Sequence, residues 1–182
     1  AVAAYLDAKP AAATGLACLR ELYQAWGMPY FSGERSCRAG NMDDDAADEV
    51  IAVLAQVMDE PPDLIQYRVA VFDSSGGGYR VAHTSEQTVT AGATANWLGN
   101  ILLDVGDVNA DGTGDAVYAL HQCGAHTCSR TIFAVQGQEA EYGLLTPAEG
   151  LRQETTTISI DDIDGDGPRE IIMYGGVIQS AG

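Results

Sequence analysis

Basic residues are scarce in this chain. Lysine and arginine together number 9 against 26 aspartates and glutamates, which gives the 182 residues a formal net charge of −17. Proteins that bind nucleic acid or anionic membranes carry basic patches that neutralise phosphate groups, and no basic stripe occurs here. We therefore expect no nucleic acid and no anionic membrane surface among its partners.

Long apolar runs and catalytic signatures are also missing. No apolar segment approaches the ~20 residues that a membrane-spanning helix needs, so we expect no membrane insertion. Serine, histidine and aspartate all occur, but no G-x-S-x-G, H-E-x-x-H or phosphate-binding glycine loop accompanies them. We therefore expect neither catalytic residues nor an autonomous enzyme.

Two acidic stretches repeat one pattern of oxygen-bearing residues. In loop 107–115, positions 1, 3, 5 and 9 are Asp107, Asn109, Asp111 and Asp115. In loop 162–170, the same positions are Asp162, Asp164, Asp166 and Glu170. Both loops have a glycine at position 6, which permits a sharp turn that folds these side chains inward. This is the ligand pattern of a Ca²⁺ site, and we expect each loop to bind one ion.

The segments around the two loops do not fit an EF-hand. That motif requires a glutamate at position 12 and a helix on each side. A dockerin domain is excluded for the same reason. Position 12 is Tyr118 in one loop and Met173 in the other. Each loop lies instead between short runs of strand-forming residues, 100–105 and 115–120 for the first loop, 155–160 and 170–174 for the second. The sequence therefore predicts strand, loop, strand units.

These units resemble the FG-GAP or VCBS repeats, which build integrin-type β-propeller blades and many bacterial extracellular modules. In that family a D-x-[DN]-x-D-G-x-x-[DE] loop binds Ca²⁺, and the backbone carbonyl at position 7 is a further ligand. The resemblance implies that Thr113 and Pro168 supply this carbonyl. It also implies a calcium-stabilised module for adhesion or ligand binding, with a protein or glycan as partner.

Loop 41–49 is a weaker copy of the same pattern. Its residues at positions 1, 3, 5, 7 and 9 are Asn41, Asp43, Asp45, Ala47 and Glu49. Ala46 replaces the glycine at position 6, where a left-handed turn would cost roughly 1–2 kcal/mol. A helix that begins in this acidic segment is the alternative, because the apolar residues of 50–58 also fall at helical spacing. The order of the strands that follow favours a third calcium loop.

The spacing of the loops predicts a mainly β protein. First ligands at 41, 107 and 162 lie 66 and 55 residues apart, which suits antiparallel, propeller-like blades of four strands. The chain then holds two complete repeats, 41–106 and 107–161, and the start of a third, 162–182. Closed propellers need about four to eight blades, so this chain cannot close a ring alone.

The first 40 residues lie outside this pattern and are expected to form a helical cap. Leu16, Leu19, Tyr23 and Trp26 fall on one helical face, with Pro10 before the run and Gly27 after it. Terminal segments of repeat proteins are often atypical because they must cover an exposed end of the core.

Four cysteines indicate an oxidising compartment, which is extracellular, periplasmic or at the cell surface. Their spacing favours the disulfides Cys18–Cys37 and Cys123–Cys128. A zinc site is the alternative for the second pair, which has His121 and His126 nearby. The sequence as a whole favours a non-catalytic, extracellular calcium-binding module, and an accessory domain of a larger secreted enzyme is the alternative.

Overall fold

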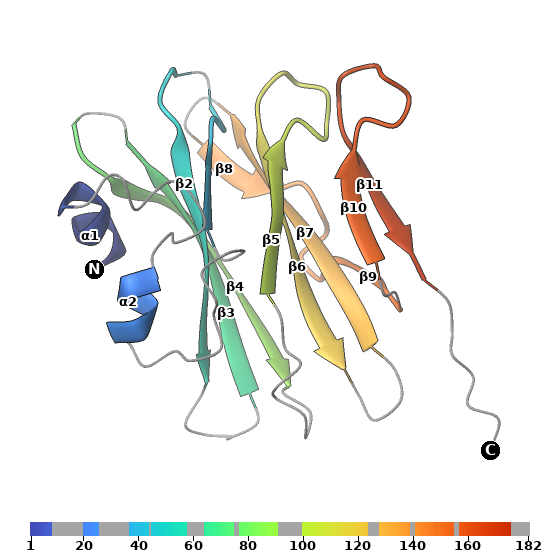
Figure 1. Cartoon of the computed structure of the whole chain (residues 1–182), viewed down its shortest axis with the longest axis horizontal. Helices are drawn as coiled ribbons and strands as arrows, with labels where there is room; N and C mark the ends of the chain where they lie inside the picture. The colour runs from blue at the N-terminus through green and yellow to red at the C-terminus, as the bar shows by residue number, and fades with distance from the viewer. Residues whose placement is uncertain are drawn as a thin grey trace.

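The computed structural model describes residues 1–8, 20–25, 37–43, 45–57, 64–74, 77–90, 100–123, 128–138, 141–154 and 157–175. Three antiparallel sheets of four, five and two strands lie side by side, and two short helices flank the first sheet (Figure 1). The prediction of a mainly β protein with antiparallel sheets is confirmed. Across these ranges the sheets do not close into a ring.

The first sheet has the strand order β1-β2-β3-β4. Its strands are β1 (Cys37–Gly40), β2 (Glu49–Val57), β3 (Leu64–Asp73) and β4 (Arg80–Thr90). The helix considered for residues 50–58 is therefore wrong, because this segment is a strand through Val57. Val50, Ile51, Ala52 and Val53 are all fully buried, since both faces of the sheet are covered. A strand with two covered faces is continuously apolar, and this explains why its spacing also suits a helix.

The second and third sheets repeat this arrangement. The second contains β5 (Asn100–Gly106), β6 (Asp115–Cys123), β7 (Cys128–Gln138), β8 (Glu141–Leu144) and β9 (Leu151–Gln153), which pairs with β7. The third contains β10 (Thr157–Asp161) and β11 (Glu170–Tyr174). In every sheet the acidic loop joins the first two strands. Each sheet thus begins one strand before its loop. The predicted repeat boundaries, which start at the first ligand of each loop, therefore fall between the first and second strands of each sheet.

In the strand that follows each loop, successive side chains point to opposite faces, and this alternation fixes how the sheets stack. Residues two and four places beyond position 9 face the next sheet, and residues one and three places beyond face the previous layer. Between the first and second sheets these residues are Ile51 and Val53 from β2 with Ala116 and Tyr118 from β6. Between the second and third sheets they are Val117 and Ala119 from β6 with Ile171 and Met173 from β11. The same rule therefore builds both interfaces.

Helix α1 (Val2–Ala8) covers the outer face of the first sheet. Val2 and Leu6 are buried against Val50, Ala52 and Phe72, and Figure 1 shows the helix at this end of the stack. The prediction that a helix in the N-terminal region caps one end of the stack is thus confirmed. The predicted helix overlaps α2 (Arg20–Ala25), whereas Leu16, Leu19 and Trp26 lie outside the described residues. The sequence prediction missed α1.

The cysteines are consistent with the predicted oxidised state. Cys37 is buried and disulfide-bonded, and Cys18, its predicted partner, lies outside the described residues. Cys123 and Cys128 are directly opposite in the β6–β7 ladder, where the Cα separation suits a disulfide. We expect intact mass after alkylation without reductant to show no added groups. Four alkylated thiols would contradict both pairings, and a retained zinc ion would contradict the pairing of Cys123 with Cys128.

Candidate metal-binding loops

Loop 107–115 and loop 162–170 share one frame of backbone hydrogen bonds. The N–H at position 2 donates to the carboxylate at position 9 over 2.9 Å in both loops. The N–H groups at positions 4 and 6 donate to the two oxygens of the aspartate at position 1, at 2.7–3.0 Å in one loop and 2.7–3.1 Å in the other. The N–H at position 5 donates to the side chain at position 3, at 2.9 and 3.2 Å. The ligand side chains are therefore oriented by the loop backbone itself.

Two turns in the left-handed region fold each of these loops. Gly112 and Gly167 at position 6 have φ of 90° and 108°, as their identity predicts. Position 4 is also left-handed, with φ of 66° at Ala110 and 79° at Gly165. The sequence reasoning missed this second turn, and Gly165 was the available signal for it.

Loop 41–49 keeps part of the same frame. Met42 N–H donates to Glu49 over 2.7 Å, which is the bond from position 2 to position 9. Asp45 N–H donates to Asp43 over 2.9 Å, and Ala47 N–H donates to Asp45 over 2.6 Å. The last bond has its counterpart in loop 107–115, where Thr113 N–H donates to Asp111 over 2.8 Å. Ala46 does not adopt the left-handed turn that glycine makes at position 6 of the other loops, since Ala110 is the only residue other than glycine with positive φ in the described chain.

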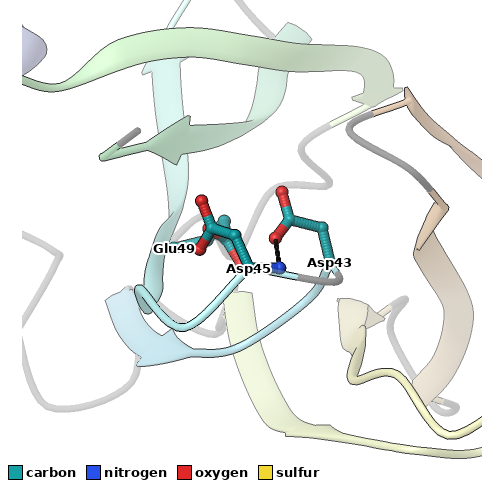
Figure 2. A group of neighbouring side chains, drawn as sticks. All are labelled: Asp43, Asp45 and Glu49. Carbon is teal, nitrogen blue, oxygen red and sulfur yellow. Dashed lines mark hydrogen bonds between the residues drawn. The ribbon is translucent and has the colours of Figure 1, made fainter. Parts of the chain in front are cut away.

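Two loops gather three carboxylates each into a candidate metal site. Ligand oxygens of Asp43, Asp45 and Glu49 lie within 4.8 Å of one another, and Figure 2 shows them around the turn before β2. Asp162, Asp164 and Asp166 form a second triad with the same spacing. In loop 107–115, where position 3 is an amide, no such triad of carboxylates is gathered. Asn109 Nδ2 donates to Asp111 over 2.8 Å and to Gln136 over 3.2 Å.

Two of the three carboxylates at position 9 are the most deeply buried acidic groups of the loops. Glu49 and Asp115 are fully buried, whereas Glu170 is half-buried. One oxygen of each buried side chain accepts the N–H from position 2, and the other, Glu49 Oε1 or Asp115 Oδ1, has no hydrogen-bond partner. A buried, unpartnered carboxylate oxygen is costly unless a cation or proton satisfies it.

The raised pKa values of these two side chains reflect that cost. Burial raises the pKa of Glu49 from 4.5 to about 7, and the charges on Asp43 and Asp45 add to the effect of burial, against the opposing Met42 hydrogen bond. Burial likewise raises the pKa of Asp115 from 3.8 to about 6, with further contributions from Asp111 and Asp107. Without a cation these two carboxylates therefore hold protons more tightly than ordinary carboxylates do.

Neighbouring loops are joined by a repeated backbone hydrogen bond. Gly114 N–H, at position 8 of its loop, donates to the Asn41 carbonyl at position 1 of the preceding loop over 3.2 Å. Arg169 N–H, also at position 8, donates to the Asp107 carbonyl at position 1 over 2.8 Å. The three loops thus form a continuous row along one edge of the stack (Figure 1).

Side chains from distant strands complete the surroundings of loop 41–49. Tyr142 on β8 donates its hydroxyl to Asp43 Oδ2 over 3.2 Å, from 99 residues away in the sequence. Asp73 at the end of β3 is fully buried, forms an ion pair with Arg80 and adds to the rise in the pKa of Glu49. No local sequence signal connects these residues to the loop, so the sequence reasoning did not find them.

The predicted carbonyl ligands at position 7 differ in their surroundings. Thr113 donates its hydroxyl to Asp111 over 2.6 Å and to the Gly137 carbonyl over 3.3 Å, which holds loop 107–115 against β7. Pro168 and Ala47 are half-buried at the corresponding places. Their role as ligands stays a prediction.

Gly137 on β7 gives a direct test of how loop 41–49 docks on the second sheet. A Cβ atom at Gly137 would lie 1.9 Å from the Met42 carbonyl oxygen, so we expect Gly137→Ala to displace the loop. Overpacking of this kind costs about 1–3 kcal/mol, and urea unfolding should detect a loss in that range. Gly143→Ala on β8 is the matched control, because a Cβ there meets nothing within 4 Å. Equal stability of the two variants would contradict this docking.

No family model, curated protein or solved structure matches the chain. The likeness to FG-GAP or VCBS repeats therefore rests on the loop residues and their flanking strands. In the described ranges no helix is long and apolar enough to span a membrane.

Proposed function

We propose that this chain is a calcium-binding, calcium-stabilised repeat module that acts outside the cytoplasm in adhesion or ligand binding, without catalysis of its own. Its three loops hold structural Ca²⁺ ions through Asp, Asn and Glu side chains and the carbonyl at position 7. The oxidised state expected for the cysteines agrees with such a location, where free Ca²⁺ is abundant.

The observation that carries the proposal is the pair of unpartnered oxygens on Glu49 and Asp115. Each belongs to a fully buried carboxylate whose other oxygen is already fixed by a backbone N–H. A hard divalent cation takes several oxygen ligands at 2.3–2.6 Å and would neutralise the surrounding negative charge. A small row of such sites therefore accounts for acidic residues that would otherwise destabilise the fold.

Calcium titration by calorimetry tests the proposal. We expect binding with Kd on the order of 10⁻⁴–10⁻³ M, as is typical of extracellular modules. Asp45→Ala and Asp164→Ala should each remove one binding event. Asp48→Ala and Asp161→Ala are matched controls, because each removes one exposed carboxylate that is not at a ligand position: Asp48 at position 8 of its loop and Asp161 just before its loop. If all four variants lost the same heat, general acidity and not the loops would explain the binding.

A further inference from the structure

Loop 41–49, the first loop, is held in part by loop 107–115, the second loop. Gly114 N–H, at position 8 of the second loop, donates to the Asn41 carbonyl over 3.2 Å. Asn41 in turn donates its side-chain amide to the carbonyl of Asp45, a member of the carboxylate triad. A hydrogen-bonded path therefore runs from the second loop to a candidate ligand of the first.

Gly137 on β7 is a further connection between the two loops. Its carbonyl accepts the hydroxyl of Thr113, at position 7 of the second loop, over 3.3 Å. Its Cα lies so close to the first loop that an added Cβ would be 1.9 Å from the Met42 carbonyl oxygen. The backbone of Gly137 thus contacts both loops, and its position depends on both.

Tyr142 on β8 links the same piece of sheet to a second candidate ligand. It donates its hydroxyl to Asp43 Oδ2 over 3.2 Å, and its side chain packs against the core between the first two sheets. In the β7–β8 ladder Tyr142 is the direct partner of Gly137. The two contacts therefore come from one paired segment of the second sheet, which also touches the second loop.

We propose that the second loop and its sheet position the ligands of the first loop, so that calcium in the second loop raises the calcium affinity of the first. An ion in the second loop is held by positions 7 and 9, on either side of Gly114, and so fixes the N–H that reaches Asn41. A loop that is already ordered loses less conformational entropy when it binds its own ion. The inference rests on the proposed function, because both loops must bind calcium.

The charge of the first ion to bind opposes this coupling only in part. The second loop has three carboxylates, on Asp107, Asp111 and Asp115, so one Ca²⁺ leaves it at −3 + 2 = −1. A loaded second loop therefore still attracts a cation to the first. Stacked sheets lie about 10 Å apart, and charges separated by more than about 8 Å are largely screened at physiological ionic strength. We expect the contacts to decide the sign, which makes the cooperativity positive.

Calcium titration followed by amide NMR spectra measures the two loops separately. Met42 N–H donates to Glu49 in the first loop, and Val108 N–H donates to Asp115 in the second. Each amide signal therefore reports the carboxylate at position 9 of its own loop. In the wild type at physiological ionic strength, we expect both signals to move over the same range of calcium concentration.

Variants that disable one loop test whether the other responds. Asp111→Ala removes a candidate ligand of the second loop, and we expect it to raise the calcium concentration at half-saturation of the Met42 signal about fivefold or more. Asp45→Ala, in the first loop, should raise the half-saturation of the Val108 signal by the same factor, because coupling between binding sites is reciprocal. An unchanged Met42 signal in Asp111→Ala, with both loops still titrating in the wild type, would overturn the coupling and leave the proposed function standing.

Tyr142→Phe tests the positioning contact itself, since it removes only the hydroxyl that donates to Asp43. We expect a larger rise in half-saturation for the Met42 signal than for the Val108 signal. Equal rises for the two signals would contradict a specific role of Tyr142 at the first loop.

Glu141→Gln is the matched control for charge. Glu141 is exposed and precedes Tyr142 on β8, so this variant removes one negative charge from the second sheet but no candidate ligand. The half-saturation of the Met42 signal should stay close to that of the wild type. Equal effects of Glu141→Gln and Asp111→Ala would overturn the proposal, because charge and not contact would then couple the loops. Amide signals that do not respond to calcium at all would contradict the proposed function, and the coupling with it.

Discussion

Removal of calcium is expected to lower the melting temperature of the chain by on the order of 10 °C. A site occupied at about ten times its Kd stabilises the folded state by about 1.4 kcal/mol, so three sites contribute about 4 kcal/mol. For a domain of this size, 1 kcal/mol corresponds to about 2–4 °C. Thermal melts of the metal-free and calcium-saturated protein measure the difference. An unchanged melting temperature would contradict a structural role for the loops.

The same samples separate a structural clamp from a calcium sensor. Sensor EF-hands expose an apolar groove when calcium moves a pair of helices. Here each loop joins two strands of one sheet, so no helix pair is present to open. We expect a hydrophobic dye to bind equally with and without calcium at room temperature. Strong dye binding induced by calcium would favour the sensor.

The stability of the metal-free protein is expected to fall as pH rises from about 4.5 to about 7. The pKa of Glu49 is raised from 4.5 to about 7, so the folded state holds the proton more tightly than the unfolded state between these values. Stability is therefore lost as the pH rises through this window. Since one pKa unit corresponds to about 1.4 kcal/mol, the loss from Glu49 is on the order of 3 kcal/mol. Asp115, with its pKa raised to about 6, adds a loss in the same direction.

Calcium should reverse this pH dependence, because the bound ion replaces the proton on each carboxylate. The stabilisation by calcium should accordingly grow between pH 5 and pH 8, as measured by melts of resin-decalcified and calcium-loaded protein. Glu49→Gln provides the control: it keeps an acceptor for Met42 N–H but removes the charge. This variant should be more stable than the wild type without metal at pH 8, and should gain less from calcium. A metal-free protein that becomes more stable towards pH 8 would contradict the account.

The strand, loop, strand units could be predicted because their signals are local. Ligand spacing and flanking strand formers lie within about 20 residues, and they also identified loop 41–49 despite Ala46. The turn at position 4 was missed because only Gly165 signals it, whereas Ala110 in the other loop gives no sign of positive φ. The contact of Tyr142 with Asp43, the burial of Asp73 and the docking of α1 depend on how sheets stack. Such contacts between distant segments leave no periodic pattern in one sequence.

The buried carboxylates at position 9 are the centre of the account, and anomalous diffraction from crystals grown in calcium tests them most directly. We predict a calcium peak in each of the loops 41–49, 107–115 and 162–170. In the first two, Glu49 Oε1 and Asp115 Oδ1, which lack hydrogen-bond partners, should lie 2.3–2.6 Å from the ion. Loops without anomalous density at saturating calcium, with these two oxygens still unpartnered, would contradict the account.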